Sequence, residues 1–167
     1  MKLKIPKKLI LDACCGGRMF WFNKFHPNTI YIDHRVAQKG HIKYWQAKNH
    51  SVDPDIVMDF RSIKFKNESF KLVVFDPPHM IRRTESGYQQ AKYGSLHTDT
   101  WKQDLKTGFD ECWRVLKKHG ILIFKWNEVS VPVGKIISIL KKEPLFGHKA
   151  GKTQKTHWLC FMKLKNV

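Results

Sequence analysis

The residues of this sequence best placed to do chemistry are carboxylates at the ends of short apolar runs. Asp12 follows Leu9–Leu11, Asp33 follows Thr29–Ile32, Asp59 follows Asp55–Met58, and Asp76 follows Phe70–Phe75. If these runs are strands of one open α/β sheet, the four side chains converge in the crevice where such sheets bind ligands. A crevice of carboxylates disfavours phosphates and suits a ligand with an amine and hydroxyl groups. Aspartates at strand ends also serve as turn formers, but four after successive strands favour a binding site.

The residues that follow two of these aspartates predict a close-approach turn and a rigid segment of backbone at the same crevice. The sequence Ala-Cys-Cys-Gly-Gly follows Asp12, and Pro-Pro-His follows Asp76. Glycines let the backbone approach a ligand closely, whereas paired prolines stiffen the chain. A purely structural Asp-Pro-Pro turn is the alternative interpretation.

A third candidate region is the segment from His79 to His97, which has neither helical nor strand periodicity. It contains Arg82, Arg83, Tyr88, Gln89, Gln90, Lys92 and Tyr93. Cations mixed with aromatic rings suit contacts to nucleic-acid backbones and bases. Long irregular segments inside compact domains are uncommon and often act as lids or binding loops. We therefore expect residues 79–97 to be a substrate-binding or lid insertion, with a solvated, partly helical excursion as the alternative.

The strands that position these residues are predicted by their apolar pattern. The four runs named above, together with Ile121–Phe124, are continuous rather than alternating, as is typical of strands covered on both faces. The stretch Thr156–Leu164 alternates loosely and is a further strand candidate.

Helices are expected between the strands, over Arg18–Phe25, Thr98–His119 and Val133–Lys142. In the longest of them, apolar residues recur at three- and four-residue steps, and Gly120 stands where a helix would stop. The alternation of strands and helices predicts an α/β fold with a mostly parallel sheet and an antiparallel edge.

Composition narrows the partners. The 167 residues suit one domain spanning 1–167, and 31 Lys+Arg against 14 Asp+Glu give a net charge of +17. Such a charge is expected to attract nucleic acid, with a solubilising surface as the alternative. No apolar run approaches the roughly 18 residues that span a bilayer. The basic start also lacks the apolar segment of a signal peptide. We expect a cytoplasmic protein without a membrane partner.

Cysteine and histidine positions argue against a metal site. Cys14, Cys15, Cys112 and Cys160 form no C-x-x-C pair, and the nine histidines have no metal-binding spacing. None of the cysteines follows a proline, which disfavours nucleophilic attack on a pyrimidine ring. We expect no metal, and we expect Cys14 and Cys15 to be small packing residues.

From Leu9 to about Lys165, the sequence resembles the class I S-adenosylmethionine-dependent methyltransferases. Residues 9–17, Leu-Ile-Leu-Asp-Ala-Cys-Cys-Gly-Gly, resemble the glycine-rich first motif, although Arg18 stands where small residues are common. Asp33 stands where the family has its ribose-binding acid, and Asp59-Phe60 resembles the pair that holds the adenine. Asp76-Pro77-Pro78-His79 resembles the (D/N)-P-P-(aromatic) motif of enzymes that methylate amino nitrogens. Small stand-alone members of this type occur on phages and other mobile elements.

The resemblance implies a Rossmann-like methyltransferase fold, with helices on both faces of a twisted sheet and an antiparallel C-terminal strand. It implies S-adenosylmethionine as cofactor and S-adenosylhomocysteine as product. The expected cofactor-binding residues are Asp12, Cys14, Gly16, Gly17, Asp33, His34, Asp59 and Phe60. Asp12 would attract the cofactor ammonium, Asp33 would accept the ribose hydroxyls, and Arg18 is an alternative partner for the cofactor carboxylate.

The resemblance also assigns the acceptor end of the site. The expected catalytic residues are Asp76, Pro77, Pro78 and His79, with His79 in the position usually held by Tyr, Phe or Trp. Asp76 and the Pro77 carbonyl would accept hydrogen bonds from the amine, and His79 would stack on the base. The expected substrate-binding residues are Arg82, Arg83, Tyr88, Lys92, Tyr93, Lys125 and Trp126, with a core role as the alternative for Trp126.

These features together predict an N-methyltransferase that acts on the exocyclic amine of a nucleic-acid base, adenine N6 first. DNA and RNA remain open as substrates, and so does the oligomeric state. We expect no separate target-recognition domain in 167 residues, so specificity would rest on the His79–His97 segment, on the basic surface or on a specificity partner. The alternatives are methylation of a small molecule or protein, and a non-catalytic nucleic-acid-binding protein on a methyltransferase fold.

Overall fold

The computed structural model describes residues 8–42, 48–83, 87–149, 151 and 155–164. Its elements are β1 (Ile10–Asp12), β2 (Thr29–Asp33), β3 (Ile56–Val57), the short 3₁₀ helix η2 (Phe60–Ser62), β4 (Phe70–Phe75), β5 (Ile81–Arg82), α1 (Tyr88–Tyr93), β6 (Leu96–His97), α2 (Trp101–Val115), β7 (Leu116–Asn127), α3 (Val133–Leu140), β8 (Phe146–Lys149) and β9 (Thr156–Met162).

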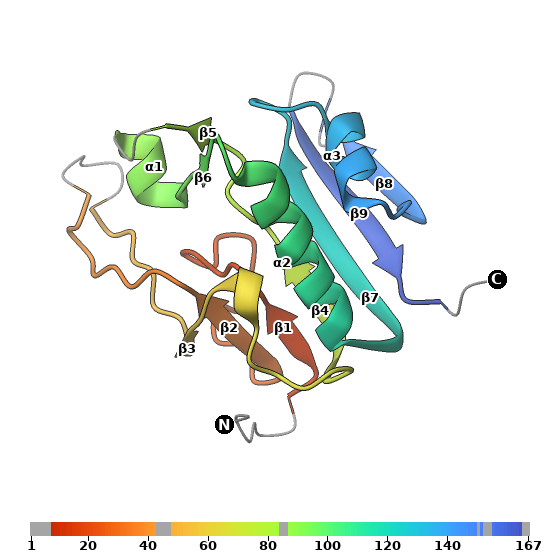
Figure 1. Ribbon diagram of the computed structural model, residues 1–167. Coiled ribbons are helices and arrows are strands. Elements are labelled where there is room, and N and C mark those ends of the chain that lie inside the picture. The colour runs from red at the N-terminus through yellow and green to blue at the C-terminus, as the bar shows by residue number, and fades with distance from the viewer. Residues whose placement is uncertain (1–7, 43–47, 84–86, 150, 152–154, 165–167) are drawn as a thin grey trace.

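Seven strands form one sheet in the order β3-β2-β1-β4-β7-β9-β8, and β5 and β6 form a separate two-stranded ribbon (Figure 1). The strands from β3 to β7 in this order pair in parallel, whereas β9 is antiparallel to both β7 and β8. The predicted α/β class, with a mostly parallel sheet and an antiparallel C-terminal strand, is confirmed. No helix among the described residues is long and apolar enough to cross a membrane.

One face of the sheet packs against α2 and α3, which lie side by side (Figure 1). The ring of Phe109 in α2 lies 6.3 Å from that of Phe124 in β7 and 5.1 Å from that of Phe161 in β9. The stripe predicted for this helix is buried at Trp101, Leu105, Phe109 and Cys112. Each large apolar side chain buried in this way contributes about 1.5–3 kcal/mol.

The opposite face is covered in a different way. Successive side chains of a strand point to opposite faces, so Tyr31 points away from Ile30 and Ile32, which belong to the core. The ring of Trp21 lies edge-on to Tyr31 at 5.2 Å, and the ring of Phe20 meets Trp158 at 5.6 Å. The sequence predicts helices on both faces. Among the described residues, helices cover one face, and the irregular segment 18–28 covers part of the other.

The helix predicted over Arg18–Phe25 is wrong, and the reason lies in Arg18. Its φ of 53° is incompatible with the first turn of a right-handed helix. Its buried guanidinium bonds to the backbone carbonyls of Lys24 and Asp53, both at 2.7 Å, and to Asp55 Oδ1 at 3.1 Å. The chain therefore loops around this guanidinium, which is already hydrogen-bonded to three partners of its own chain.

The helix predicted to reach His119 ends at Val115, because Leu116 is already extended and begins β7. Gly120, expected to stop a helix, instead lies within this strand. A Cβ at Gly120 would come within 2.9 Å of the Lys71 carbonyl oxygen, so only glycine allows this close approach. The helix Val133–Leu140 and the strand Thr156–Met162 end two residues earlier than expected. Strand β8 has no counterpart in the prediction.

Candidate active site

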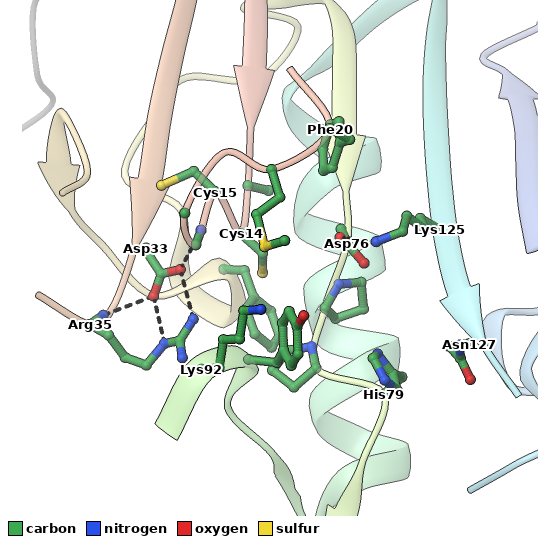
Figure 2. Close-up of a pocket in the computed structure, with 18 of the residues that line it drawn as sticks. Cys14, Cys15, Phe20, Asp33, Arg35, Asp76, His79, Lys92, Lys125 and Asn127 are labelled. Atoms are coloured by element: carbon green, nitrogen blue, oxygen red, sulfur yellow. Dashed lines mark hydrogen bonds and ion pairs between the residues drawn. The ribbon is translucent and has the colours of Figure 1, made fainter. Parts of the chain in front are cut away.

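A cavity of about 430 Å³ lies at the carboxyl ends of β1, β2, β4 and β7 (Figure 2). Its lining residues are Ala13, Cys14, Cys15, Gly16, Gly17, Met19, Phe20, Asp33, His34, Arg35, His50, Phe60, Asp76, Pro77, Pro78, His79, Gln89, Lys92, Tyr93, Lys125, Asn127 and Thr156. Figure 2 shows Asp33 with Arg35 on one side of the cavity and Asp76 with Lys125 on the other, with Cys14 between them. The strand ends therefore bring two of the four aspartates to one hollow.

The turn after β1 forms the floor of this cavity. Gly16 has a φ of +46°, a conformation that glycine adopts without strain, and its N–H donates to Asp33 Oδ2 at 3.0 Å. A Cβ at Gly17 would lie 3.0 Å from His50 Nε2, so a larger residue would crowd the imidazole. The two glycines keep this turn tight and tie it to the end of β2.

Asp33 is almost fully buried, and both of its carboxylate oxygens accept hydrogen bonds from other residues of the protein. Oδ1 accepts from the Arg35 backbone N–H at 2.9 Å and from Arg35 Nε at 3.2 Å. Oδ2 accepts from the Gly16 N–H and, at 3.4 Å, from an Arg35 terminal nitrogen. An ionised carboxylate has about four acceptor positions, so Arg35 and Gly16 together fill Asp33. Its neighbour His34 is exposed and lines the cavity.

Asp12 lies behind the cavity wall rather than in it. Its side chain has no exposure to solvent; it accepts from Trp21 Nε1 at 2.7 Å and from the Cys14 N–H at 3.3 Å. Burial raises the pKa of Asp12 to about 7, although both hydrogen bonds act to lower it. Asp12 therefore supports the turn after β1 from behind, and the structure gives it no direct access to a ligand.

Of the acid and the aromatic residue expected to hold an adenine, one reaches the cavity. Phe60 lines the cavity, but Asp59 does not. Asp59 instead caps η2, accepting from the Arg61 N–H at 2.7 Å and from the Arg61 guanidinium at 2.6 Å. Burial acts to raise the pKa of Asp59, but these hydrogen bonds hold it below its ordinary value.

At the other end of the cavity, Asp76 forms an ion pair with Lys125. Lys125 Nζ donates to Asp76 Oδ2 at 2.6 Å, and the ammonium lies 5.6 Å from the centre of the Phe20 ring and 5.7 Å from that of the Trp158 ring. Burial raises the pKa of Asp76, and Lys125 opposes that rise. Among the described residues, no donor is hydrogen-bonded to Asp76 Oδ1, so this oxygen remains an acceptor.

His79 stands beside this pair as a neutral aromatic ring. Burial, and then the positive charge of Lys125, lower the pKa of His79. Its ring lies 6.5 Å from those of Tyr93 and Trp126. Pro77 and Pro78 complete the wall, so the whole Asp-Pro-Pro-His segment lines the cavity.

The predicted substrate residues divide into two groups. Lys92, Tyr93 and Lys125 line the cavity, whereas Arg82, Arg83 and Tyr88 do not. Trp126 is fully buried and donates from Nε1 to the Val131 carbonyl at 2.9 Å, which is the core role held open for it.

Outside the motif of residues 9–17 and the segment of residues 79–97, six lining residues are absent from the sequence-based site: Met19, Phe20, Arg35, His50, Asn127 and Thr156. Only Arg35 has a local signal. It follows Asp33 at the same spacing at which Arg61 follows Asp59, and each arginine bonds back to its aspartate.

The cysteines of the site are neutral thiols. Burial raises the pKa of Cys14 and of Cys15 well above the ordinary thiol value, and nearby carboxylates add to the rise. Neutral thiols are poor nucleophiles, so the cavity favours direct transfer over covalent catalysis by cysteine. Within the described ranges, no three His, Cys, Asp or Glu side chains are grouped to hold a metal ion.

Comparisons with known proteins identify the architecture. No protein-family model and no curated protein sequence matches the chain. Among solved structures, the chain is similar to the N-methyltransferase NodS from Bradyrhizobium japonicum WM9, with a TM-score of 0.57, 14% identity, and 95% and 86% of the two chains covered. The fold is that of the S-adenosylmethionine-dependent methyltransferases.

Two further structures share this methyltransferase fold. One is 1,6-didemethyltoxoflavin-N1-methyltransferase from Burkholderia thailandensis, with bound 1,6-didemethyltoxoflavin and S-adenosylhomocysteine (TM-score 0.56, 10% identity, 94% of this chain and 71% of that chain). The other is an S-adenosylmethionine-dependent methyltransferase from Aquifex aeolicus (TM-score 0.53, 14% identity, 94% and 82%). At these identities the likeness extends to the fold, and the substrate must be argued from the cavity.

Proposed function

We propose that this chain is an S-adenosylmethionine-dependent N-methyltransferase acting on an exocyclic amine of a nucleic-acid base, adenine N6 first. The observation that carries the proposal is the Asp76–Lys125 pair, which opens on the same cavity as the Gly16–Gly17 turn and Asp33. One cavity thus contains a tight glycine turn with a ribose-type acceptor at one end and an Asp-Pro-Pro segment at the other.

The residues of the cavity fit the cofactor. The Gly16–Gly17 turn leaves room for a ligand to approach the backbone, and Phe60 offers an apolar wall. Asp33 provides a carboxylate for two ribose hydroxyls once Arg35 releases it. S-adenosylhomocysteine is bound to the Burkholderia neighbour. When bound, the cofactor supplies a methyl group on a sulfonium, which is an electrophile.

The chain's own residues then position the acceptor amine. Lys125 fixes Oδ2 of Asp76, which leaves Oδ1 to accept one N–H of the amine, and the Pro77 carbonyl accepts the other. These two bonds favour a pyramidal nitrogen whose lone pair points at the methyl group. Because the nitrogen becomes positive during transfer, the bond to Asp76 strengthens in the transition state. Asp76 Oδ1 is also placed to accept the proton that the methylated nitrogen loses.

The neutral His79 ring and Tyr93 form an aromatic wall for the base. A base must leave its stack to reach such a pocket, and ring contacts of this kind suit an unpaired base. The net charge of +17 supports a polyanionic substrate. A small-molecule amine is the second candidate, because the Burkholderia neighbour has 1,6-didemethyltoxoflavin, a small molecule, bound to it.

The decisive experiment is transfer of a tritiated methyl group from S-adenosylmethionine to total RNA and to DNA, followed by mass spectrometry of nucleosides. Asp76→Ala removes both acceptor oxygens and should lower turnover by about 10²–10³, the range for loss of one preorganised electrostatic partner. Asp110→Ala is the matched control, because Asp110 is exposed on α2 and forms an ion pair with Lys106, outside the cavity. Parental turnover by Asp76→Ala would refute the assignment, and label in neither nucleic acid would favour a small-molecule acceptor.

A further inference from the structure

A second hollow adjoins the active-site cavity and extends beyond the residues considered so far. It is a groove of about 600 Å³ between the segment after β1, the connection from β2 to β3, and α1. Its lining residues are Gly16, Gly17, Arg18, Met19, Lys24, Phe25, Lys39, Asn49, His50, Ser51, Asp53 and Lys92. Both hollows share Gly16, Gly17, Met19, His50 and Lys92, so the groove is continuous with the active site.

The groove concentrates positive charge. Lys24, Lys39 and Lys92 reach it from three separate segments, and among the described residues neither Lys24 nor Lys39 forms an ion pair. Of the described residues that line it, Asp53 alone is acidic. Burial, and then nearby groups that include Lys92 and Lys24, lower the pKa of His50, which also lines the groove. Such uncompensated cations favour an anionic ligand.

The groove also displays apolar side chains to solvent. Phe25 is 80% exposed and Met19 is 56% exposed, and the neighbouring Phe22 is fully exposed. An aromatic ring left in water forgoes about 1.5–3 kcal/mol of burial, so a cluster of this kind marks a contact surface. Phe25 and Lys24 are adjacent in sequence, which places a stacking surface beside a cation.

The walls of the groove are held in place by Arg18. Its guanidinium joins the Lys24 carbonyl to the Asp53 carbonyl, each at 2.7 Å, and it lies 5.4 Å from the Phe25 ring. The loop that carries Lys24 and Phe25 is therefore fixed against the connection that carries Asp53. A preformed groove binds without the cost of ordering its walls.

We propose that this groove binds single-stranded nucleic acid next to the methyl-transfer site, with phosphates on the lysines and one base stacked on Phe25. This inference rests on the proposed function and specifies its substrate as a single strand. Cations beside an exposed aromatic ring are the combination that single-strand binders use. Two other anionic ligands fit the groove less well. A duplex offers phosphates but hides the faces of its bases, and an acidic protein partner has no base to stack on Phe25.

The test is fluorescence anisotropy with a labelled single-stranded oligonucleotide, as DNA and as RNA, and with the matching duplex. The double variant Lys24→Gln/Lys39→Gln should bind the single strand at least tenfold more weakly at low salt, and its log–log salt slope should fall by about 1–2. Phe25→Ala should weaken binding about 5–100-fold, the value of one stacked base, with an unchanged salt slope. The matched controls are Lys118→Gln near the amino end of β7 and Phe146→Ala on β8, which is 67% exposed.

Two results would overturn the groove assignment: duplex binding as tight as single-strand binding, or losses in the groove variants no larger than in the controls. Titration of S-adenosylhomocysteine into the parent protein keeps this outcome separate from the proposed function. The parent protein could fail both to bind S-adenosylhomocysteine and to transfer a methyl group, while the groove variants still lose affinity for the single strand. In that case the groove assignment stands and the enzymatic proposal fails.

Discussion

Replacing Arg35 should tighten cofactor binding, although Arg35 lines the cofactor end of the cavity. Its guanidinium occupies two of the acceptor positions of Asp33, the positions that two ribose hydroxyls need. In Arg35→Ala the backbone N–H of residue 35 and the Gly16 N–H still bind Asp33, so half of its capacity becomes available to the ligand.

The size of the effect follows from the geometry. The guanidinium contacts are 3.2 and 3.4 Å, longer than the 2.7–2.9 Å of strong charge-assisted bonds. Each is therefore worth about 0.5–1 kcal/mol, at the low end for hydrogen bonds. Removing both spares the ligand about 1–2 kcal/mol, which corresponds to roughly 5–30-fold tighter binding.

Isothermal titration of S-adenosylhomocysteine into each variant measures this effect. Arg35→Lys keeps a charge but lacks the planar fork, and its affinity should lie between those of the parent and Arg35→Ala. Arg61→Ala is the matched control, because Arg61 binds Asp59 at the same spacing outside the cavity. Equal or weaker binding by Arg35→Ala would show that the guanidinium contributes to the bound state, and the displacement argument would be refuted.

Three further predictions concern pH, packing and the acceptor. The pKa of Asp12 is raised to about 7 in the folded protein, so the contribution of this side chain to stability is present below pH 4 and is lost between about pH 4 and 7. In urea titrations across this pH range, the free energy of unfolding of the parent protein should decline by a few kcal/mol through this effect, and that of Asp12→Asn should not. Parallel curves for the two proteins would contradict this prediction. Gly108→Ala places a Cβ 2.3 Å from the Phe60 ring. Although alanine gains about 1 kcal/mol in helix propensity, this clash should lower the free energy of unfolding by about 1–3 kcal/mol. A variant more stable than the parent protein would contradict this packing. His79→Tyr should methylate nucleic acid at nearly the parental rate in single-turnover assays, whereas His79→Ala should weaken acceptor binding about 5–100-fold; equal binding by both variants would exclude stacking.

The sequence predicts the sheet and its ligand edge better than it predicts which carboxylates reach the ligand. All four aspartates end strands or follow them, as expected. Only Asp33 and Asp76 line the cavity, because Trp21 holds Asp12 behind the wall and Arg61 holds Asp59 at the cap of η2. These partners are chosen by three-dimensional proximity and side-chain rotamers, which strand periodicity does not encode.

The errors in the elements have a similar origin. Residues 18–25 lack a local helix breaker after the glycines. Their loop is imposed by two acceptors for Arg18 far along the chain, the backbone carbonyl of Asp53 and a side-chain oxygen of Asp55. The polar residues before Gly120 are typical of a helix end. They belong instead to β7, with His119 at a φ of 61°, because the His119 N–H donates to the Lys163 carbonyl and the Lys163 N–H donates to the Gly120 carbonyl. Pairing over such separations leaves no short-range signal.

The regular pairing of β7 with β4 beyond Ile121 limits how the length of this chain can vary. No loop separates Val115 from Leu116, and the register of β7 on β4 shifts before Ile121, but from Ile121 to Phe124 the two strands pair residue by residue. A shift of one residue along a strand moves every side chain to the other face, so an insertion or deletion between Ile121 and Lys125 would turn Lys125 away from Asp76. Viable insertions and deletions in homologous chains should therefore avoid this stretch.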